Sequence, residues 1–256
     1  MRPLAATLAA AMLIGCSGGD RKQAEPSVKA EKATPVYFKV DPSTAGVVQG
    51  SVAFKGRKPA RMTVDMSSDP ACVEAHRGKA FDESVVINPN GTLANVFVYI
   101  KSGLDDKTFE PPATPVNIDQ KGCWFHPRVI GIQVGQVYHV TNSDPVTHNI
   151  HPLAQTNREW NHSQGPGDPE LTRKFTKPEV MVPVKCNIHS WMHAYIGVLP
   201  HPYFAVSNAQ GSFKLENLPP GDYVLAAWHE KYGTAEQKIT LSKSGTSEVT
   251  FTFQGE

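Results

Sequence analysis

Residues 185–193, with the sequence KCNIHSWMH, constrain this chain more than any other stretch. They place a cysteine, a histidine and a methionine at Cys-x2-His-x2-Met spacing, as Cys186, His189 and Met192. A thiolate, an imidazole and a weak thioether suit copper cycling between Cu(I) and Cu(II), because a His/His/Cys plane with a distant Met is a compromise between the geometries the two states prefer. One turn cannot surround an ion, so a second histidine must come from another strand.

The chain around this turn has the pattern of a β protein. Alternating apolar and polar residues form short runs separated by glycine, proline and asparagine turns. One short helix is expected over residues 69–77, with Ser68 or Asp69 as its cap and Pro70 in its first turn. With 256 residues, the chain has room for one large or two small domains. The spacing of the strands predicts an all-β sandwich architecture.

Charge and motifs exclude several functions. Lys plus Arg is 25 and Asp plus Glu is 24, and no basic patch with interleaved aromatic residues is present, so nucleic acid is not an expected partner. The sequence has no catalytic-triad order, paired-carboxylate motif, phosphate-binding loop or dinucleotide fingerprint. We therefore expect a metal-binding or electron-carrying protein and not an enzyme.

The N-terminus has the pattern of an export signal. One positive charge precedes an apolar run too short to span a bilayer comfortably, and the run ends in Leu-Ile-Gly-Cys16. This ending resembles a bacterial lipobox, which implies cleavage before Cys16 and acylation of that cysteine; an ordinary secretory signal or an uncleaved anchor is the alternative. Residues 17–45 are polar and predict a flexible tether. The expected location is the bacterial cell envelope, with the protein lipid-anchored on the periplasmic or another extracytoplasmic side.

The remaining cysteines suggest a disulfide. The sequence has four cysteines, of which Cys16 would carry lipid and Cys186 lies in the metal turn. The other two, Cys72 and Cys123, are expected to form a disulfide in an oxidising compartment. The alternative is that Cys123 and His126 form a second Cys-x2-His metal site.

A second stretch supplies the missing histidine. Residues 135–144, followed by His148 and Asn149, resemble the strand, loop and first ligand of the blue copper proteins (cupredoxins) of the plastocyanin and amicyanin type. The short ligand loop that starts at Cys186 resembles amicyanin in particular. The resemblance covers roughly residues 91–200 and implies a Greek-key sandwich that holds one copper ion.

The same resemblance assigns roles to single residues. His148 matches the upstream histidine ligand, Cys186 the thiolate, His189 the histidine with an exposed edge, and Met192 the axial ligand. Asn149 matches an asparagine whose hydrogen bonds join the two ligand loops, and such outer contacts fix ligand geometry.

Other residues of the region have competing interpretations. Met192 could be a core methionine beside Trp191. His151 is a possible extra donor, although strand alternation places it on the face opposite His148. His193 is either a replacement ligand or a solvated histidine. Four further histidines are expected at the surface or in loops: His126, His162, His201 and His229.

The last part of the chain has a resemblance of its own. Residues 208–225 resemble the turn and strand signature of carboxypeptidase regulatory-like domains, which are small transthyretin-like β-sandwiches. The early strand of that family matches residues 46–52, so residues 46–60 are expected to complete this sandwich, with the cupredoxin inserted; the alternative is that they belong to the cupredoxin. The expected segments are signal 1–16, tether 17–45, N-terminal β segment 46–90, cupredoxin 91–200 and C-terminal sandwich 201–256.

These expectations lead to one favoured function and two rivals. An ion with four protein ligands lacks the open position that substrate chemistry needs, which favours single-electron transfer between redox proteins. The exposed edge of His189, with Trp191 beside it, would then contact the partners. The rivals are copper delivery, storage or sensing, and a non-redox binding or structural module of the envelope.

Overall fold

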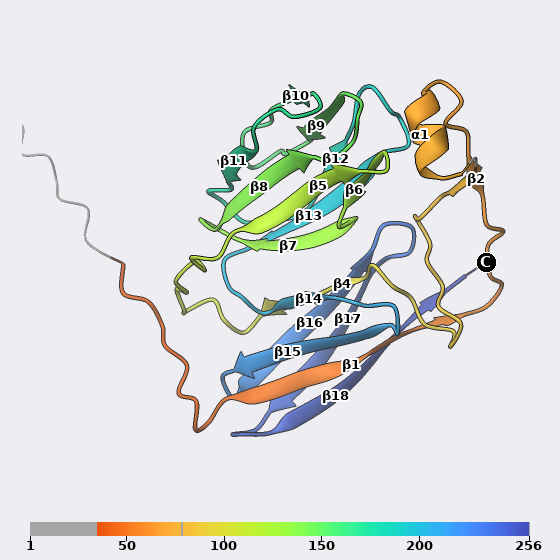
Figure 1. Ribbon diagram of the computed structural model, residues 1–256. Coiled ribbons are helices and arrows are strands. Elements are labelled where there is room, and N and C mark those ends of the chain that lie inside the picture. Colours follow the sequence, from red (N-terminus) through yellow and green to blue (C-terminus); the bar gives the residue numbers. More distant parts are fainter. Residues whose placement is uncertain (1–34, 78, 256) are drawn as a thin grey trace, which may run out of the picture. The chain divides into compact units, whose positions relative to one another are not determined.

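Strands make up nearly all of the regular structure, which confirms the all-β prediction. The computed structural model describes residues 35–77 and 79–255 (Figure 1). The predicted signal 1–16, with Cys16, and the tether as far as residue 34 lie outside these residues. Within the described ranges, no helix has the length and hydropathy needed to cross a membrane.

The described end of the tether already contacts the folded part. The Phe38 N–H donates to the Thr108 carbonyl at 2.7 Å. The Phe38 ring meets the Phe109 ring edge-on, with 5.7 Å between the centroids. The predicted boundary at residue 45 is therefore too late along the chain.

One β-sandwich, which we call the host sandwich, combines strands from the two ends of the described chain. Its sheets have the orders β15-β1-β18 and β14-β4-β16-β17 (Figure 1). Alternate residues of the first strand, such as Val48 and Val52, are fully buried and pack in its core with Phe251. The strands are β1 (Gly46–Lys55), β4 (Phe97–Ser102), β14 (Phe204–Val206), β15 (Ser212–Leu218), β16 (Gly221–His229), β17 (Gly233–Leu241) and β18 (Thr246–Gln254).

The pairing of β1 and β4 decides the domain organisation. Strand β1 runs parallel to β18, with Val47 opposite Thr246, and antiparallel to β15. Residues 46–55 thus complete the C-terminal sandwich, as expected, and the alternative that they belong to the cupredoxin is wrong. Strand β4 lies between β14 and β16, so it also belongs to the host sandwich. The predicted domain boundary at residue 91 is therefore wrong.

A second β-sandwich, the inserted sandwich, spans residues 116–199 between β4 and β14. Its sheets have the orders β10-β9-β12-β13-β7 and β11-β8-β5-β6. Apolar side chains of both sheets, among them Ile118, Tyr138 and Ile196, form one buried core. The strands are β5 (Val116–Lys121), β6 (Trp124–His126), β7 (Val129–Gln133), β8 (Val137–Asn142), β9 (His148–Pro152), β10 (His162–Gln164), β11 (Leu171–Lys174), β12 (Glu179–Lys185) and β13 (His193–Leu199).

The two sandwiches contact each other through the outer face of β4. Val98 and Ile100 point into the host core, whereas Phe97 and Tyr99 belong to a separate buried cluster shared with β7, β13 and β16. Glycine at position 197 makes the close approach possible, because a Cβ there would lie 2.3 Å from the Phe97 ring. The contact explains why both faces of β4 are apolar.

A buried ion pair also joins the sandwiches. The Arg128 guanidinium, just before β7, donates two hydrogen bonds to the Glu230 carboxylate in the β16–β17 turn, at 2.6 and 2.9 Å. Both side chains are 7% exposed. Two parallel hydrogen bonds give such a pair a defined geometry as well as charge compensation.

A short segment of the chain between β1 and β4 packs against the inserted sandwich. This cap segment, residues 65–77, lies between β2 (Thr63–Val64) and β3 (Ala80–Phe81) and contains helix α1 (Pro70–Ala75). Of the two predicted caps, Ser68 and Asp69, it is Asp69 that caps the helix by accepting the Ala71 N–H at 3.0 Å, and Pro70 occupies the first turn, where no donor is needed. Cys72 of α1 forms the predicted disulfide with Cys123.

Candidate metal centre

The cysteine-containing turn closes a hairpin in the five-stranded sheet. Strands β12 and β13 pair antiparallel as far as Lys185 opposite His193, and the turn lies between those residues. The Cys186 N–H donates to the Met192 carbonyl at 3.2 Å, and the Met192 N–H donates to the His189 carbonyl at 3.0 Å. The backbone of the turn is therefore fixed by its own hydrogen bonds.

His148 reaches the same place from β9, which pairs with β12. The Nδ1 atoms of His148 and His189 are 2.9 Å apart. One ring nitrogen of each histidine and the Cys186 sulfur lie within 4.8 Å of one another. The exposed fractions of the three residues are 0%, 3% and 3% in the order His148, Cys186 and His189. The structure thus brings two imidazoles and one thiol together in one buried cluster.

The surroundings of the Cys186 sulfur favour the thiolate. Its sulfur accepts the backbone N–H of Asn149 at 3.4 Å and that of His189 at 3.3 Å. Burial by itself would raise the pKa of the thiol, but the His148 imidazole and these N–H groups lower it below its ordinary value. A thiolate is the form that binds a metal.

The outer nitrogen of His148 is held by a carboxylate. Its Nε2 lies 2.8 Å from Asp144 Oδ2. Asp144 in turn accepts the N–H groups of Gly122 and Cys123 at 2.6 and 2.7 Å. Burial would lower the pKa of His148, but Asp144 and the Cys186 thiolate raise it to about 9. The ring is thereby oriented with Nδ1 toward the other donors.

The outer nitrogen of His189 is also held by a carboxylate, that of Asp69 in the cap segment. The distance from His189 Nε2 to Asp69 Oδ2 is 3.1 Å. Burial, followed by repulsion from His148, lowers the pKa of His189 despite this contact. The prediction of an exposed His189 edge is wrong, because the side chain is only 3% exposed and its outer nitrogen faces Asp69.

Asn149 joins the two ligand loops, as the resemblance implied. Its Oδ1 accepts the Asn187 N–H at 2.5 Å, directly after Cys186, and its own N–H donates to the Cys186 sulfur. Its side-chain amide also donates to Asn161. The loop of His148 and the turn of Cys186 are therefore held together by hydrogen bonds of the protein itself.

The remaining predicted site residues lie as follows. Met192 is fully buried in the same apolar core as Cys186, in keeping with either an axial ligand or a core methionine. His151 is outside the cluster, with its Nε2 2.6 Å from Glu159. His193 lies at the start of β13, where its side chain reaches solvent but partial desolvation of its ring, followed by the charge of Arg128, lowers its pKa.

The other histidines divide into two pairs. His126 and His162 are exposed, as expected. His201 and His229 are buried, at 6% and 2% exposed. His201 still lies in a loop, between β13 and β14, as one of the two expected settings, whereas His229 is the last residue of strand β16, so the expectation of a surface or loop position is wrong for His229. His201 fits in the interior because Nε2 faces the Ile100 carbonyl at 2.9 Å while Nδ1 accepts the Tyr203 N–H at 3.3 Å. A neutral histidine with both nitrogens satisfied can be buried at little cost.

The alternative to the disulfide, a second metal site at Cys123 and His126, is wrong. The sulfur of Cys123 is bonded to Cys72, so it is not available as a thiolate to act with His126. Sequence reasoning missed Asp69 and Asp144 as parts of the site. The position of Asp144 four residues before His148 was a usable local signal, whereas Asp69 was recognised only as a helix cap.

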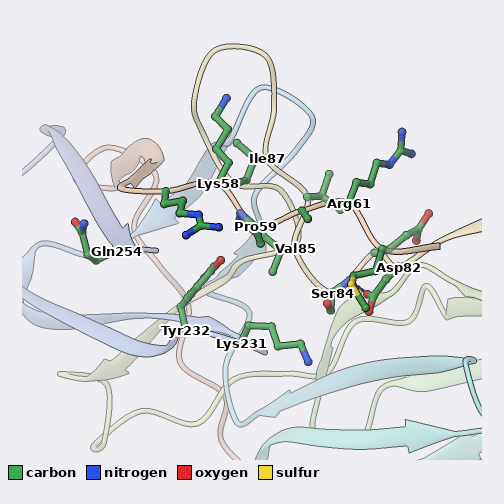
Figure 2. A pocket seen from close by; sticks show the side chains of 15 residues that line it. Lys58, Pro59, Arg61, Asp82, Ser84, Val85, Ile87, Lys231, Tyr232 and Gln254 are labelled. Carbon is green, nitrogen blue, oxygen red and sulfur yellow. Dashed lines mark hydrogen bonds between the residues drawn. The ribbon is translucent and has the colours of Figure 1, made fainter. Parts of the chain in front are cut away.

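A cavity of about 1170 Å³ lies apart from these residues (Figure 2). It is formed by residues 57–62 and 82–87 together with Lys231, Tyr232 and Gln254. Its walls carry charges of both signs. Among the described residues that line it, none is a histidine or a cysteine, so it offers no imidazole or thiolate to a metal.

Part of the host sandwich matches a family model. Residues 196–254 match the carboxypeptidase regulatory-like domain. The predicted resemblance of the C-terminal sandwich to this family is thereby confirmed. The match includes β14 to β18 but leaves out β1 and β4, which complete the same sandwich from upstream. No protein with a curated description matches the chain.

Several solved structures resemble a part of the chain. A Cu-containing nitrite reductase from Thermus scotoductus SA-01 is 25% identical with a TM-score of 0.32, over 40% of this chain and 25% of that chain. An oxidized amicyanin mutant is 16% identical with a TM-score of 0.30, over 40% of this chain and 97% of that chain. A purple cupredoxin from Nitrosopumilus maritimus is 19% identical with a TM-score of 0.28, over 32% of this chain and 98% of that chain.

Proposed function

We propose that this protein is a type 1 (blue) copper protein that carries single electrons between redox partners. The observation that supports this most is the buried convergence of two imidazole Nδ1 atoms and one thiolate, contributed by His148, His189 and Cys186. A His2Cys set with a weak thioether, here Met192, is the donor set of copper electron-transfer sites.

The residues around the donors fit a resident ion. Both outer imidazole nitrogens face carboxylates, on Asp144 and Asp69, so each ring presents its Nδ1 inward. Outer contacts of this kind orient metal-binding histidines and fix their tautomers. Asn149 holds the two ligand loops together. These contacts would hold the donors in place around a bound ion.

Burial favours electron transfer over catalysis and over metal delivery. Bound copper would supply one-electron exchange between its Cu(I) and Cu(II) states. Substrate chemistry requires an open coordination position, and delivery requires a ligand that a recipient protein can reach. The three donors are at most 3% exposed. The exposed large apolar side chain of the ligand loop is Ile188, at 53%, and we propose that redox partners contact the protein there.

The proposed setting is the bacterial cell envelope. The lipobox-like sequence that ends at Cys16 would anchor the chain by lipid, with the described part on the periplasmic or another extracytoplasmic side. The Cys72–Cys123 disulfide is in keeping with an oxidising compartment. The proposed partners are redox proteins and the membrane surface, not nucleic acid.

Copper titration of the purified chain tests this function, with Cys16→Ser to keep it unacylated. We expect an intense visible thiolate-to-Cu(II) charge-transfer band, absent from Cys186→Ser, and reversible one-electron voltammetry. A colourless protein that binds Cu(I) tightly would instead indicate delivery or storage. No copper binding at all would leave a structural or binding module of the envelope.

A further inference from the structure

The carboxylate on His189 comes from a distant part of the chain. Asp69 lies 120 residues before His189, in the cap segment that leaves the host sandwich between β1 and β4. Its two oxygens have separate partners: Oδ1 accepts the Ala71 N–H and caps α1, whereas Oδ2 faces His189 Nε2. Helix capping alone therefore does not account for both oxygens.

A disulfide holds this carboxylate in place. Cys72, three residues after Asp69, is bonded to Cys123, and both cysteines are at most 1% exposed. His76 adds a second link, with its Nε2 2.6 Å from the Gly122 carbonyl. Because the bond is buried away from soluble reductants, it serves as an anchor for α1 and not as an exchanging redox centre.

The disulfide also connects the two carboxylates of the site. The N–H of Cys123 donates to Asp144, which holds His148, while Cys72 shares a helix turn with Asp69, which holds His189. The cysteine sulfurs lie within 4.8 Å of these groups: Cys72 with Asp69 and His189, and Cys123 with Asp144 and His148. One covalent bond thus ties together the two groups that orient the two histidines.

We propose that Asp69, anchored through the Cys72–Cys123 disulfide, is a positioning residue of the metal centre that strengthens His189 as a ligand and lowers the reduction potential of the site. This inference rests on the proposed function for the identity of the metal. It adds a part of the centre that comes from outside the inserted sandwich.

The physical basis is the charge of the acceptor. A carboxylate that accepts the Nε2–H keeps the proton on that nitrogen, leaves the Nδ1 lone pair for the metal and makes the ring a stronger base. A stronger, partly anionic donor favours Cu(II) over Cu(I). Partial burial increases the effect, because two charges at a given distance interact more strongly where the dielectric constant is lower, and the side chains of His189 and Asp69 are only 3% and 21% exposed.

Two substitutions at Asp69 separate its roles. Asp69→Asn keeps the length and the helix cap but removes the charge, and Asp69→Ser keeps a good cap but is too short to reach His189. The matched control is Glu159→Gln, which removes the same kind of carboxylate from His151, a histidine outside the metal cluster. A Cys72→Ser/Cys123→Ser pair tests the anchor.

The readouts are Zn(II) affinity, midpoint potential and thermal unfolding. We expect both Asp69 variants to bind Zn(II) roughly 10- to 100-fold more weakly, the usual cost of losing an outer partner. We expect the midpoint potential to rise by about 59 mV for each tenfold decrease in the ratio of the Cu(II) affinity to the Cu(I) affinity. The Cys72→Ser/Cys123→Ser variant should also bind Zn(II) more weakly and have a higher midpoint potential. Glu159→Gln should change neither the Zn(II) affinity nor the potential. The Asp69 variants should unfold near the wild-type temperature.

The outcomes distinguish this inference from the proposed function. If wild-type protein develops the thiolate–copper band but both Asp69 variants retain its potential and Zn(II) affinity, the inference is wrong and the function stands. If no copper band forms, the function fails, and Zn(II) affinity alone still decides whether Asp69 positions His189. A loss of affinity in Glu159→Gln as large as in the Asp69 variants would also overturn the inference.

Discussion

The Nδ1 atoms of His148 and His189 face each other at 2.9 Å, although the two residues are 41 positions apart in the chain. Two imidazole nitrogens this close can share one proton but cannot both carry one. The pKa of His148 is raised to about 9 and that of His189 is lowered, so the charge in the metal-free protein belongs on His148. His148 and His189 would hold a metal ion through these nitrogens, and binding would displace that proton.

Replacing His148 with glutamine should abolish thiolate–metal absorption. The change removes one of the inward nitrogens and leaves Cys186 with a single histidine partner. His151→Gln is the matched control, because His151 is on the same strand but bonds Glu159 outside the cluster. Titration with Cu(II) or Co(II), followed by visible spectroscopy, measures both. Equal loss of the band in the two variants would mean that His151 is a ligand after all.

Gly197→Ala should destabilise the contact between the sandwiches. The added Cβ would lie 2.3 Å from the Phe97 ring, and Phe97 is fully buried. Overpacking of this kind costs about 1 to 3 kcal/mol. The control is Gly165→Ala, where the nearest atom is 3.4 Å from the new Cβ. Equilibrium unfolding in denaturant measures the free energy of unfolding of each variant. Equal values for Gly197→Ala and Gly165→Ala would show that Phe97 moves aside freely.

Removing one member of the Arg128–Glu230 pair should lower the stability of the fold more than removing both. Arg128→Met leaves the Glu230 carboxylate buried without the guanidinium, and this usually lowers the free energy of unfolding by about 3 to 5 kcal/mol. The double variant Arg128→Met/Glu230→Leu leaves no buried charge in the pair and should recover part of that loss. Glu236→Gln, in a solvent-exposed pair with Lys101, should cost less than about 1 kcal/mol. A double variant less stable than either single variant would contradict this expectation.

Acid should weaken the fold through the buried histidines. Burial lowers the pKa of His201 to about 4, from an ordinary value of 6.5. Between these values the unfolded chain binds the proton and the folded chain does not, so stability falls as the pH drops through 6.5 toward 4 and then levels off. His229 behaves in the same way, because burial and then the charge of Arg128 lower its pKa to about 4. The titration of each histidine should lower the free energy of unfolding by on the order of 3 kcal/mol between pH 7 and pH 4.

Unfolding experiments between pH 7 and pH 4 test this acid effect. His201→Gln can still donate to the Ile100 carbonyl but does not titrate, so the stability of this variant should depend less steeply on pH. His162→Gln, at an exposed position, should keep the wild-type slope. A wild-type slope in His201→Gln would show that His201 is not the group responsible.

The sequence was informative wherever the signal was local. Donor chemistry and spacing identified Cys186 and His189, and the strand-and-loop resemblance added His148 and Asn149, which the structure places around one point. The cap at Asp69 followed from an acidic residue before a proline. Each of these patterns is made of residues a few positions apart, so it can be recognised in the sequence without knowledge of the fold.

The errors concern contacts between distant segments. Periodicity showed that β4 is a strand covered on both faces, but it could not show which sandwich the strand joins. The covered edge of His189 depends on a segment 120 residues upstream that folds back over it. The burial of His201 and His229 depends on neighbours that meet their nitrogens and charges, which sequence position alone does not reveal.

The pairing of Phe204 with Tyr99 makes β14 the neighbour of β4, although the whole inserted sandwich lies between them. In chain topology the insertion is thus an enlarged hairpin loop, and closing such a loop becomes only slowly more costly with its length. The cost of closing the loop therefore sets little limit on the size of the insertion. What ties the host to this particular insertion is the apolar outer face of β4, where Phe97 and Tyr99 are buried only because the inserted sandwich covers them.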